Sequence, residues 1–441
     1  MKRLLSLLLC AVLALFCATT AQAAGVSITL TASEYALHYA FDAGAQDPFV
    51  ILEYATPAEK GWMMLYSEDG HFEGDVSLAY SGAGGKTSVA LTSARTTGSI
   101  GKASTTLPKA ADYQKPTGKS NAKVTDFVLT ETPEGFHYAF NAIGTDYMLL
   151  YWRSKEQTVT QPVYPDENGH YEGDVVSELT FARTQFTVQV KSGSGSMKKE
   201  ATVRKGYQAP EAPQRQEGRL SGVTVCIDAG HQENGRFVNE PIGPGLTGST
   251  SGKGGMAQGT KTNRRESIVC LEIGMLLRDE LLRQGANVIM TREDQTTFHT
   301  NIERCEIAEA GGAQIMLRLH CNNSSNHSKR GIQVYGPLNS DYAKAVADAD
   351  TYREMGQKLL DAMKTRVGMT LAKSTGMVRL NDNYVGNNWA KMMCFLVEMG
   401  YLSNPAEEYL LVTPVYQQWL AEGMADGVYE IAVARGWVQA Q

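Results

Sequence analysis

The sequence lacks the features that mark a nucleic-acid-binding or a disulfide-rich protein. Its formal net charge is -6 over 441 residues, which argues against a nucleic-acid partner and leaves no polybasic patch for a membrane surface. None of its seven cysteines has CxxC spacing. Cys226, Cys270 and Cys394 lie in apolar runs, where a thiol is usually a small core residue. We therefore expect no disulfide framework.

A long hydrophobic run is also missing at the N-terminus. The apolar stretch Leu4–Phe16 is short for a membrane span. Lys2 and Arg3 precede it, and Ala21-Gln22-Ala23 has the small-x-small pattern of a signal-peptide cleavage site. An uncleaved anchor is the alternative, but no second stop-transfer run follows. We therefore expect residues 1–24 to be a signal peptide, and the mature protein to be secreted without a stable membrane span.

What the sequence does have is an internal repeat in its first half. Leu37–Phe41 recurs as Phe136–Phe140, and Asp69–Asp75 recurs as Asn168–Asp174. Both pairs are offset by the same 99 residues. Alternating strand-like runs, broken by Gly and Asp turns, surround these words. The repeat therefore indicates two copies of one all-β unit.

The chain is longer than one hydrophobic core usually holds, so several domains are expected. The repeats predict two tandem all-β modules, each a small sandwich, at residues 25–110 and 121–206. Four of the eight histidines occupy duplicated positions, which favours a shared structural role over two metal sites. We therefore exclude these four from the chemistry: His38, His71, His137 and His170.

The pattern changes after a polar, proline-containing linker at residues 207–219. Strand-like runs alternate with amphipathic helices from there on. The expected strands are 223–227, 287–291, 315–319, 332–335 and 393–397, and the expected helices are 266–284, 302–310, 352–367 and 414–434. This alternation predicts an α/β domain over residues 220–438, with a mainly parallel twisted sheet and helices on both faces.

Polar residues end three of these apolar runs. His231 follows the first strand, His320 ends another, and Glu398 ends the last. The carboxyl ends of parallel strands meet at one edge of a sheet, where ligands bind in open α/β folds. Glu266 opens a helix and can reach into such a site from the side.

These four residue types are sufficient for a hydrolytic metal site. Two imidazoles and one carboxylate, from His231, His320 and Glu266, form a three-ligand zinc site with one position open to water. Glu398 is then the general base, and later the acid that returns a proton to the leaving amine. Its apolar neighbours would desolvate it and raise its pKa.

Residue types alone leave alternatives open. Histidines satisfied in the core and a solvated glutamate would give the same pattern. Glu233 or Glu240 could replace Glu266 as a ligand. Cys321 adjoins His320, but adjacent strand residues point to opposite faces, which favours a core thiol.

The same motifs resemble the zinc-dependent N-acetylmuramoyl-L-alanine amidases of the Amidase_3 type. The resemblance covers residues 220–436 and keeps the family's order of motifs. It rests on Asp228–His231, Glu266 with Leu271, Val288–Arg292, Arg304, Arg318–Asn322 and Val397–Asn404. It implies one zinc ion at His231, Glu266 and His320, with Glu398 catalytic.

Two departures from the family pattern concern the surroundings of the site. A glycine-rich loop of 34 residues, 232–265, separates the first two ligands, and its Glu240–Gly245 word resembles a longer-loop subgroup. It would form a wall or lid of the cleft, or be functionally idle. The serine usual two positions before the second histidine is Arg318. Neither change touches a ligand.

Other polar residues near the motifs are weaker candidates for substrate binding. Asn322 and Asn404 would position loops beside the metal. Trp389 would line the cleft or pack as a core indole. Arg304 would contact substrate or, more simply, anchor its helix by hydrogen bonds. His299 and His327 lie in polar stretches and are expected to be solvated.

The sequence therefore predicts a secreted, cell-wall-associated zinc amidase. Its partner is expected to be peptidoglycan, cut between the lactyl group of N-acetylmuramic acid and L-alanine of the stem peptide. The β modules are expected to position it on a wall polymer or a protein. A zinc peptidase acting within the stem peptide and a non-catalytic wall-binding or activating protein are the alternatives.

Overall fold

The computed structural model describes most of the chain, and two compact units are present, Met1–Lys205 and Gly206–Gln441. The described residues are 19–21, 25–96, 98–120, 122–132, 135–154, 157–176, 185–204, 210–232, 238–250, 255–368 and 377–440. Of the expected signal peptide, residues 1–18 and 22–24 lie outside them, and Thr19–Ala21 forms a short strand, β1. Within the described part, no helix is long and apolar enough to cross a membrane.

The first unit is made of strands, and the repeated sequence segments form corresponding strands in the two repeats. The first repeat contains β2 (Ile28–Ala32), β3 (Ala36–Asp42), β4 (Phe49–Ala55), β5 (Glu59–Tyr66), β6 (His71–Ser77), β7 (Gly85–Ser93) and β8 (Ser99–Leu107). The second contains β9 (Val124–Thr132), β10 (Gly135–Ala142), β11 (Met148–Arg153), β12 (Gln157–Val163), β13 (His170–Val176), β14 (Gln185–Lys191) and β15 (Met197–Arg204). Each repeat has its own buried cluster, because inward side chains alternate with outward ones along the strands.

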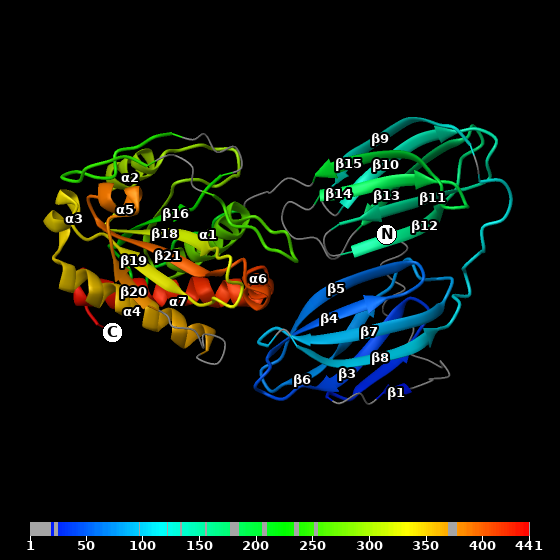
Figure 1. Ribbon diagram of the computed structural model, residues 1–441, viewed down its shortest axis with the longest axis horizontal. Coiled ribbons are helices and arrows are strands. Elements are labelled where there is room, and N and C mark those ends of the chain that lie inside the picture. Colours follow the sequence, from blue (N-terminus) through cyan, green and yellow to red (C-terminus); the bar gives the residue numbers. More distant parts are fainter. Residues whose placement is uncertain are drawn as a thin grey trace. The chain divides into compact units, whose positions relative to one another are not determined.

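The two repeats share one sheet. The strand order β15-β14-β11-β12-β5-β4-β7-β8 runs through both, while β1-β2-β3-β6 and β13-β10-β9 form separate sheets (Figure 1). The junction is the antiparallel pairing of Gln157–Val159 with Glu59–Gly61. At this junction the buried Glu59 accepts a hydrogen bond from the Gln157 side chain at 3.2 Å.

The second unit is an α/β domain around a mainly parallel sheet. The strand order is β17 (Asn287–Met290), β16 (Thr224–Ala229), β18 (Ile315–Asn322), β21 (Met393–Tyr401), β19 (Gln333–Gly336) and β20 (Met377–Leu380). Strands β17, β16, β18 and β21 are parallel, and β19 runs antiparallel to β21 and parallel to β20.

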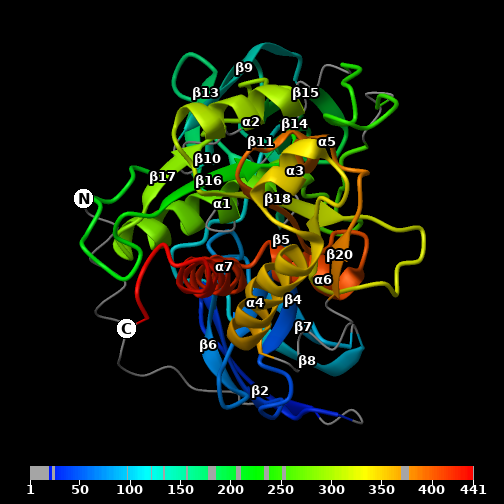
Figure 2. The same ribbon diagram turned by 90° about the vertical axis from the view of Figure 1, so that its left-hand side faces the viewer.

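Helices cover both faces of this sheet. On one face lie α1 (Glu266–Arg283), α4 (Ala349–Val367) and α7 (Pro414–Ala434), of which α4 and α7 pack side by side (Figure 2). The other face carries α2 (Asn301–Ala310) and α5 (Val385–Trp389), which pack against each other. The backbone of Gly274 in α1 lies against Ile227, whereas Cys305 of α2 packs with Cys226. Cys226 and Ile227 are adjacent on β16, so their side chains point to opposite faces of the sheet. Helices α1 and α2 therefore lie on opposite faces.

Local capping explains where several helices begin. Thr300 and Glu303 form a capping box at the start of α2. Asp348 caps α4. Asn404 caps α6 (Pro405–Leu411), with proline in its first turn. A further short helix, α3 (Asp341–Val346), precedes α4.

Candidate metal centre

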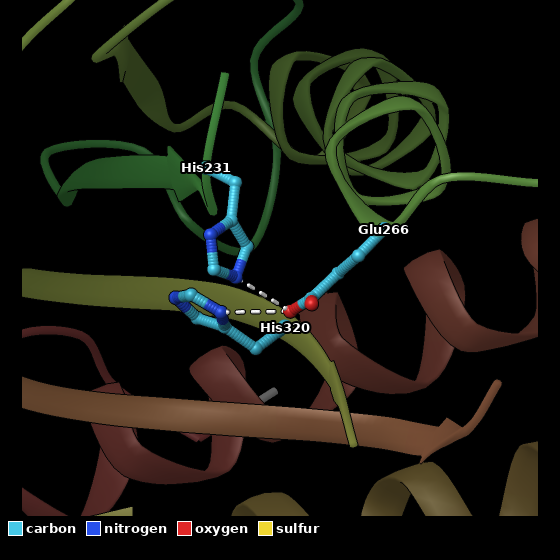
Figure 3. Close-up of side chains that lie close together, drawn as sticks. All are labelled: His231, Glu266 and His320. Carbon is cyan, nitrogen blue, oxygen red and sulfur yellow. Dashed lines mark hydrogen bonds and ion pairs between the residues drawn. The ribbon is translucent and has the colours of Figure 1, made fainter. Parts of the chain in front are cut away.

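Three side chains converge at the carboxyl edge of the sheet. Nε2 of His231 and Nδ1 of His320 each lie 3.0 Å from Oε1 of Glu266 (Figure 3). The two imidazole rings are 4.9 Å apart and edge to face. One ligand atom from each residue lies within 4.8 Å of the others, the spacing of a metal-binding group. Figure 3 shows that they come from the end of β16, from β18 and from the start of α1.

Glu266 is held in one orientation. Its side chain is buried, and Oε1 also accepts the backbone N–H of Cys321 at 3.1 Å. Oε2 accepts the backbone N–H of Ala257 at 2.7 Å. Burial opposes ionisation, but the hydrogen bonds and charge of His231 and His320 prevail and hold the pKa of Glu266 below its usual value. The carboxyl is therefore ionised, as a metal ligand must be.

His320 is suited to metal binding as a neutral imidazole. Burial lowers its pKa, and the hydrogen bond to Glu266 only partly compensates. Its Nε2 is buried with no hydrogen-bond partner among the described residues. Buried polar atoms are normally paired, so an unpaired ring nitrogen on one of these three residues fits a site that binds a metal ion.

His231 adopts a backbone conformation that is rare for its residue type. Its φ is 58°, in the left-handed region that non-glycine residues seldom occupy. The preceding Gly230 lies so close to β18 that a Cβ there would be 2.5 Å from the carbonyl of Leu319 and 2.6 Å from the ring of His320. The motif Asp228-Ala229-Gly230 thus allows the ring of His231 to lie against the ring of His320.

Two arginines fix this strand end. Arg292 donates to the carbonyls of Ala229 at 2.7 Å and Gly230 at 2.8 Å, and also to Ser267 at 2.7 Å. It therefore joins the backbone beside one candidate ligand to the backbone beside another. Arg304 donates to the carbonyl of His231 at 3.2 Å.

A buried ion cluster lies beneath these contacts. Asp228 is fully buried and pairs with Arg304 and with Arg318, the latter at 2.9 Å. Thr291 donates a further hydrogen bond to it at 2.8 Å. Burial would raise the pKa of Asp228, but the two arginines hold it well below its usual value. Arg318, the residue that departs from the family pattern, is thus a structural partner of Asp228.

Glu398 lies beside the cluster in the neighbouring strand. It is directly opposite His320 in the β18–β21 register, and paired residues of adjacent strands point to the same face. Burial, with a smaller contribution from the charge of Glu266, raises the pKa of Glu398 to about 8. Its Oε2 has no hydrogen-bond partner within the described residues. A carboxyl group with a pKa near neutrality is suited to proton transfer.

The other sequence candidates occupy different positions. Arg304 is buried in the Asp228 cluster. Asn404 caps α6 and donates to the carbonyl of His327 at 2.9 Å. The indole of Trp389 donates to the carbonyl of Pro241 at 2.9 Å.

One of the two possible substitutes for Glu266, Glu240, can be placed, and so can Cys321, the residue next to His320. Glu240 accepts hydrogen bonds from the backbone N–H of Ile302 at 2.8 Å and from the side chain of Asn301 at 2.7 Å, at the start of α2. The thiol of Cys321 is hydrogen-bonded to that of Cys270. Glu233 lies outside the described residues.

Sequence reasoning missed a group of polar side chains on the other side of Glu398. Gln333 of β19 lies opposite Glu398 in the strand register. Its amide oxygen accepts from the hydroxyl of Tyr335 at 2.6 Å and from Asn322 at 3.1 Å, and its amide nitrogen donates to the hydroxyl of Tyr401 at 3.1 Å. Asn322 is thus the one substrate-binding candidate joined to this network. The alternating word Gln333-Val334-Tyr335 was the available signal.

The fold and site define an α/β domain with a candidate metal centre at the edge of its sheet, built from two imidazoles and a carboxylate. Residues 225–430 match the family described as N-acetylmuramoyl-L-alanine amidase, Amidase_3. The resemblance inferred from the sequence is thereby confirmed for this part of the chain.

Curated relatives match the same half of the chain. The germination-specific N-acetylmuramoyl-L-alanine amidase of Bacillus subtilis is 25% identical over 230 residues, which are 49% of this chain and 83% of that protein. The probable cell wall amidase LytH of Staphylococcus aureus is 26% identical over 218 residues, 48% of this chain and 60% of LytH.

Solved structures are similar over the same portion. An N-acetylmuramoyl-L-alanine amidase from Clostridium difficile 630 is 24% identical with a TM-score of 0.38, covering 48% of this chain and 96% of that one. The apo form of the amidase Ami1 from Mycobacterium abscessus is 20% identical with a TM-score of 0.43, covering 48% of this chain and 99% of that one.

Proposed function

We propose that the protein is a secreted, zinc-dependent N-acetylmuramoyl-L-alanine amidase that acts on peptidoglycan. One observation carries the proposal: within the matched segment, His231, Glu266 and His320 converge while Glu398 lies opposite His320. The donor set of two imidazoles and one carboxylate suits one zinc ion with a position left open.

The roles of the residues follow from their surroundings. Zinc bound there would polarise the scissile carbonyl and lower the pKa of the attacking water. Glu398 takes the proton from that water as it attacks the carbonyl carbon of the lactyl group. It then gives the proton to the nitrogen of L-alanine as the C–N bond breaks. Burial raises the pKa of Glu398 above that of an ordinary carboxyl group, which suits a group that must take a proton and then give it up.

The first unit is proposed to position the enzyme on the cell wall, through a wall polymer or a protein. Its two repeated sandwiches form a body separate from the α/β domain by internal contacts. An attached module that contributes no catalytic residue most often serves binding, an inference from architecture alone.

Digestion of purified cell wall by the zinc-loaded protein tests the proposed reaction. Mass spectrometry should find intact stem peptides that begin with L-alanine. Fragments cut inside the stem would instead indicate a zinc peptidase. Glu398→Ala should abolish release but retain zinc, whereas His231→Ala should lose zinc. Equal release by wild type and Glu398→Ala would indicate a non-catalytic, wall-binding or activating role and overturn the proposal.

A further inference from the structure

The polar face that carries Glu398 continues across the next two strands. Gln333 of β19 lies opposite Glu398, and Tyr335 follows two residues along β19 on the same face. Arg379 of β20 lies opposite Tyr335 in the parallel β19–β20 pairing. Arg379 is therefore level with Leu396, two strands away from β21 and two residues back from Glu398.

The neighbouring residue supports the direction in which Arg379 points. Val378 lies against Gly356 of α4, and α4 covers the face opposite to α2 and α5. Arg379, one residue further along β20, is therefore on the face that carries Glu398.

Tyr335 is on the strand between β20 and β21, and Tyr384 packs against it. The rings of Tyr335 and Tyr384 are 5.0 Å apart and inclined by 58°, and Tyr335 is only 8% exposed. Burial raises the pKa values of both phenols; the charge of Glu398 adds to this effect and that of Arg379 opposes it.

Arg379 has no internal function in the part of the chain that the structure describes. Its side chain is exposed, and it forms no ion pair or side-chain hydrogen bond there. The other arginines near the site, Arg292, Arg304 and Arg318, are buried and bonded to backbone or to Asp228. An exposed, unpaired guanidinium beside a catalytic site is suited to binding a carboxylate.

The distance matches the length of a short peptide. Adjacent strands are about 4.8 Å apart and rise about 3.3 Å per residue, so the backbone of Arg379, two strands across and two residues along, lies roughly 12 Å from that of Glu398. An extended peptide advances about 3.3 Å per residue, and a guanidinium reaches several ångströms from its backbone. A substrate cut beside Glu398 would therefore bring its second amino acid near Arg379.

We propose that Arg379 determines substrate specificity by binding the free α-carboxylate of the second amino acid of the stem peptide. The partly exposed Tyr384, packed on the buried Tyr335, forms the surface over which the peptide reaches it. This inference rests on the proposed amidase function, since it assumes that the amide is cleaved beside Glu398.

Two synthetic substrates test this assignment. Both are N-acetylmuramoyl peptides beginning L-Ala-D-Glu, and they differ only in the α-carboxyl group of the glutamate, which is free in one and a carboxamide in the other. Arg379→Ala should raise the KM of the free acid about tenfold, the effect of losing one charge-assisted hydrogen bond. It should leave kcat, and the KM of the carboxamide, nearly unchanged. Arg379→Lys should retain part of the preference.

Arg353→Ala is the matched control, because Arg353 is an exposed arginine of α4 that pairs with Asp350. It should alter neither substrate. Equal changes of KM for both substrates in Arg379→Ala, or none, would overturn the assignment. If the wild type cleaves neither substrate, the amidase proposal fails by itself. In that case, calorimetry measures the binding of the two substrates to the zinc-loaded protein. A preference for the free acid that is lost in Arg379→Ala supports the carboxylate site, and the absence of a preference in the wild type refutes it.

Discussion

Ala257 and Glu266 exchange two hydrogen bonds. The backbone N–H of Ala257 donates to Oε2 of Glu266 over 2.7 Å, and the backbone N–H of Glu266 donates to the carbonyl of Ala257 over 2.9 Å. Oε1 is consequently the oxygen that faces both imidazoles. The end of the long loop therefore orients a candidate metal ligand, which argues against an idle role for this segment.

A buried glutamate of α6 fixes the same loop. Glu408 accepts hydrogen bonds from the hydroxyl of Thr260 at 2.8 Å and from the backbone N–H groups of Lys261 and Thr262 at 2.9 and 3.2 Å. Glu408→Ala should release this segment and lower zinc affinity on the order of tenfold or more. Competition with a chelator measures this. Glu354→Ala, at an exposed position of α4, serves as control, and equal affinities of the two variants would contradict the expected coupling.

The buried ion cluster should dominate the stability of the α/β domain. Asp228→Asn leaves Arg304 and Arg318 without their shared carboxylate, and breaking such a buried group costs about 3–5 kcal/mol. Urea denaturation should show this loss of unfolding free energy. Asp350→Asn removes an exposed carboxylate and should have little effect. A loss for Asp228→Asn of under about 1 kcal/mol would mean that the arginines find other partners.

The close packing of Gly230, the residue before His231, predicts that adding a single methyl group there weakens zinc binding. In Gly230→Ala the new Cβ would overlap the carbonyl of Leu319 and the ring of His320, so the strand ends must separate. Zinc content after dialysis should fall while the fold persists. Gly255→Ala, where a Cβ would meet nothing within 4 Å, should bind zinc as the wild type does. Retention of full zinc content by Gly230→Ala would be inconsistent with this geometry.

Glu407 predicts a pH dependence of stability. Burial raises its pKa from 4.5 to about 7, although the backbone N–H groups of Tyr401 and Gly331 oppose this. Between these values the folded state holds a proton that the unfolded state has lost. The unfolding free energy should therefore fall as pH rises from 4.5 to 7, by at most about 1.4 kcal/mol per pH unit. Glu407→Gln should remove this part of the slope in denaturation series, and an unchanged slope would contradict it.

The duplicated histidines give a prediction for the first unit. The hydrogen bond with Asp42 raises the pKa of His71, and smaller effects of Glu73 act in the same direction. This stabilisation is complete below the unfolded pKa and is lost as pH rises through the folded one. Asp42→Asn should lower the pKa of His71 in an NMR titration. The pKa of His137, raised chiefly by Asp174, should not move, and parallel shifts of both would show a general change in the fold.

Sequence patterns were informative where a polar residue follows an apolar run. The runs before His231, His320 and Glu398 correspond to β16, β18 and β21, but β18 and β21 continue past His320 and Glu398, to Asn322 and Tyr401, instead of ending there as expected. The short elements α3, α5, α6 and β20 were not predicted.

The sequence carried no signal for which strands are neighbours in the sheet. Gln333 and Arg379 approach Glu398 only because β21 pairs with β19 and β19 with β20. Likewise, two modules were expected from the repeat, but nothing near Glu59 or Gln157 in the sequence indicated that their sheets would join. Such pairings depend on the order of strands in the folded sheet.

The pairing of β5 with β12 has a consequence for the behaviour of either repeat when it is expressed alone. A strand at the rim of a sheet presents unpaired N–H and C=O groups, which recruit foreign chains. Here β5 and β12 cover part of each other's edge, and Gln157 donates a hydrogen bond to Glu59 across the pairing. Either repeat expressed by itself would expose this strand edge to other chains and would be expected to aggregate.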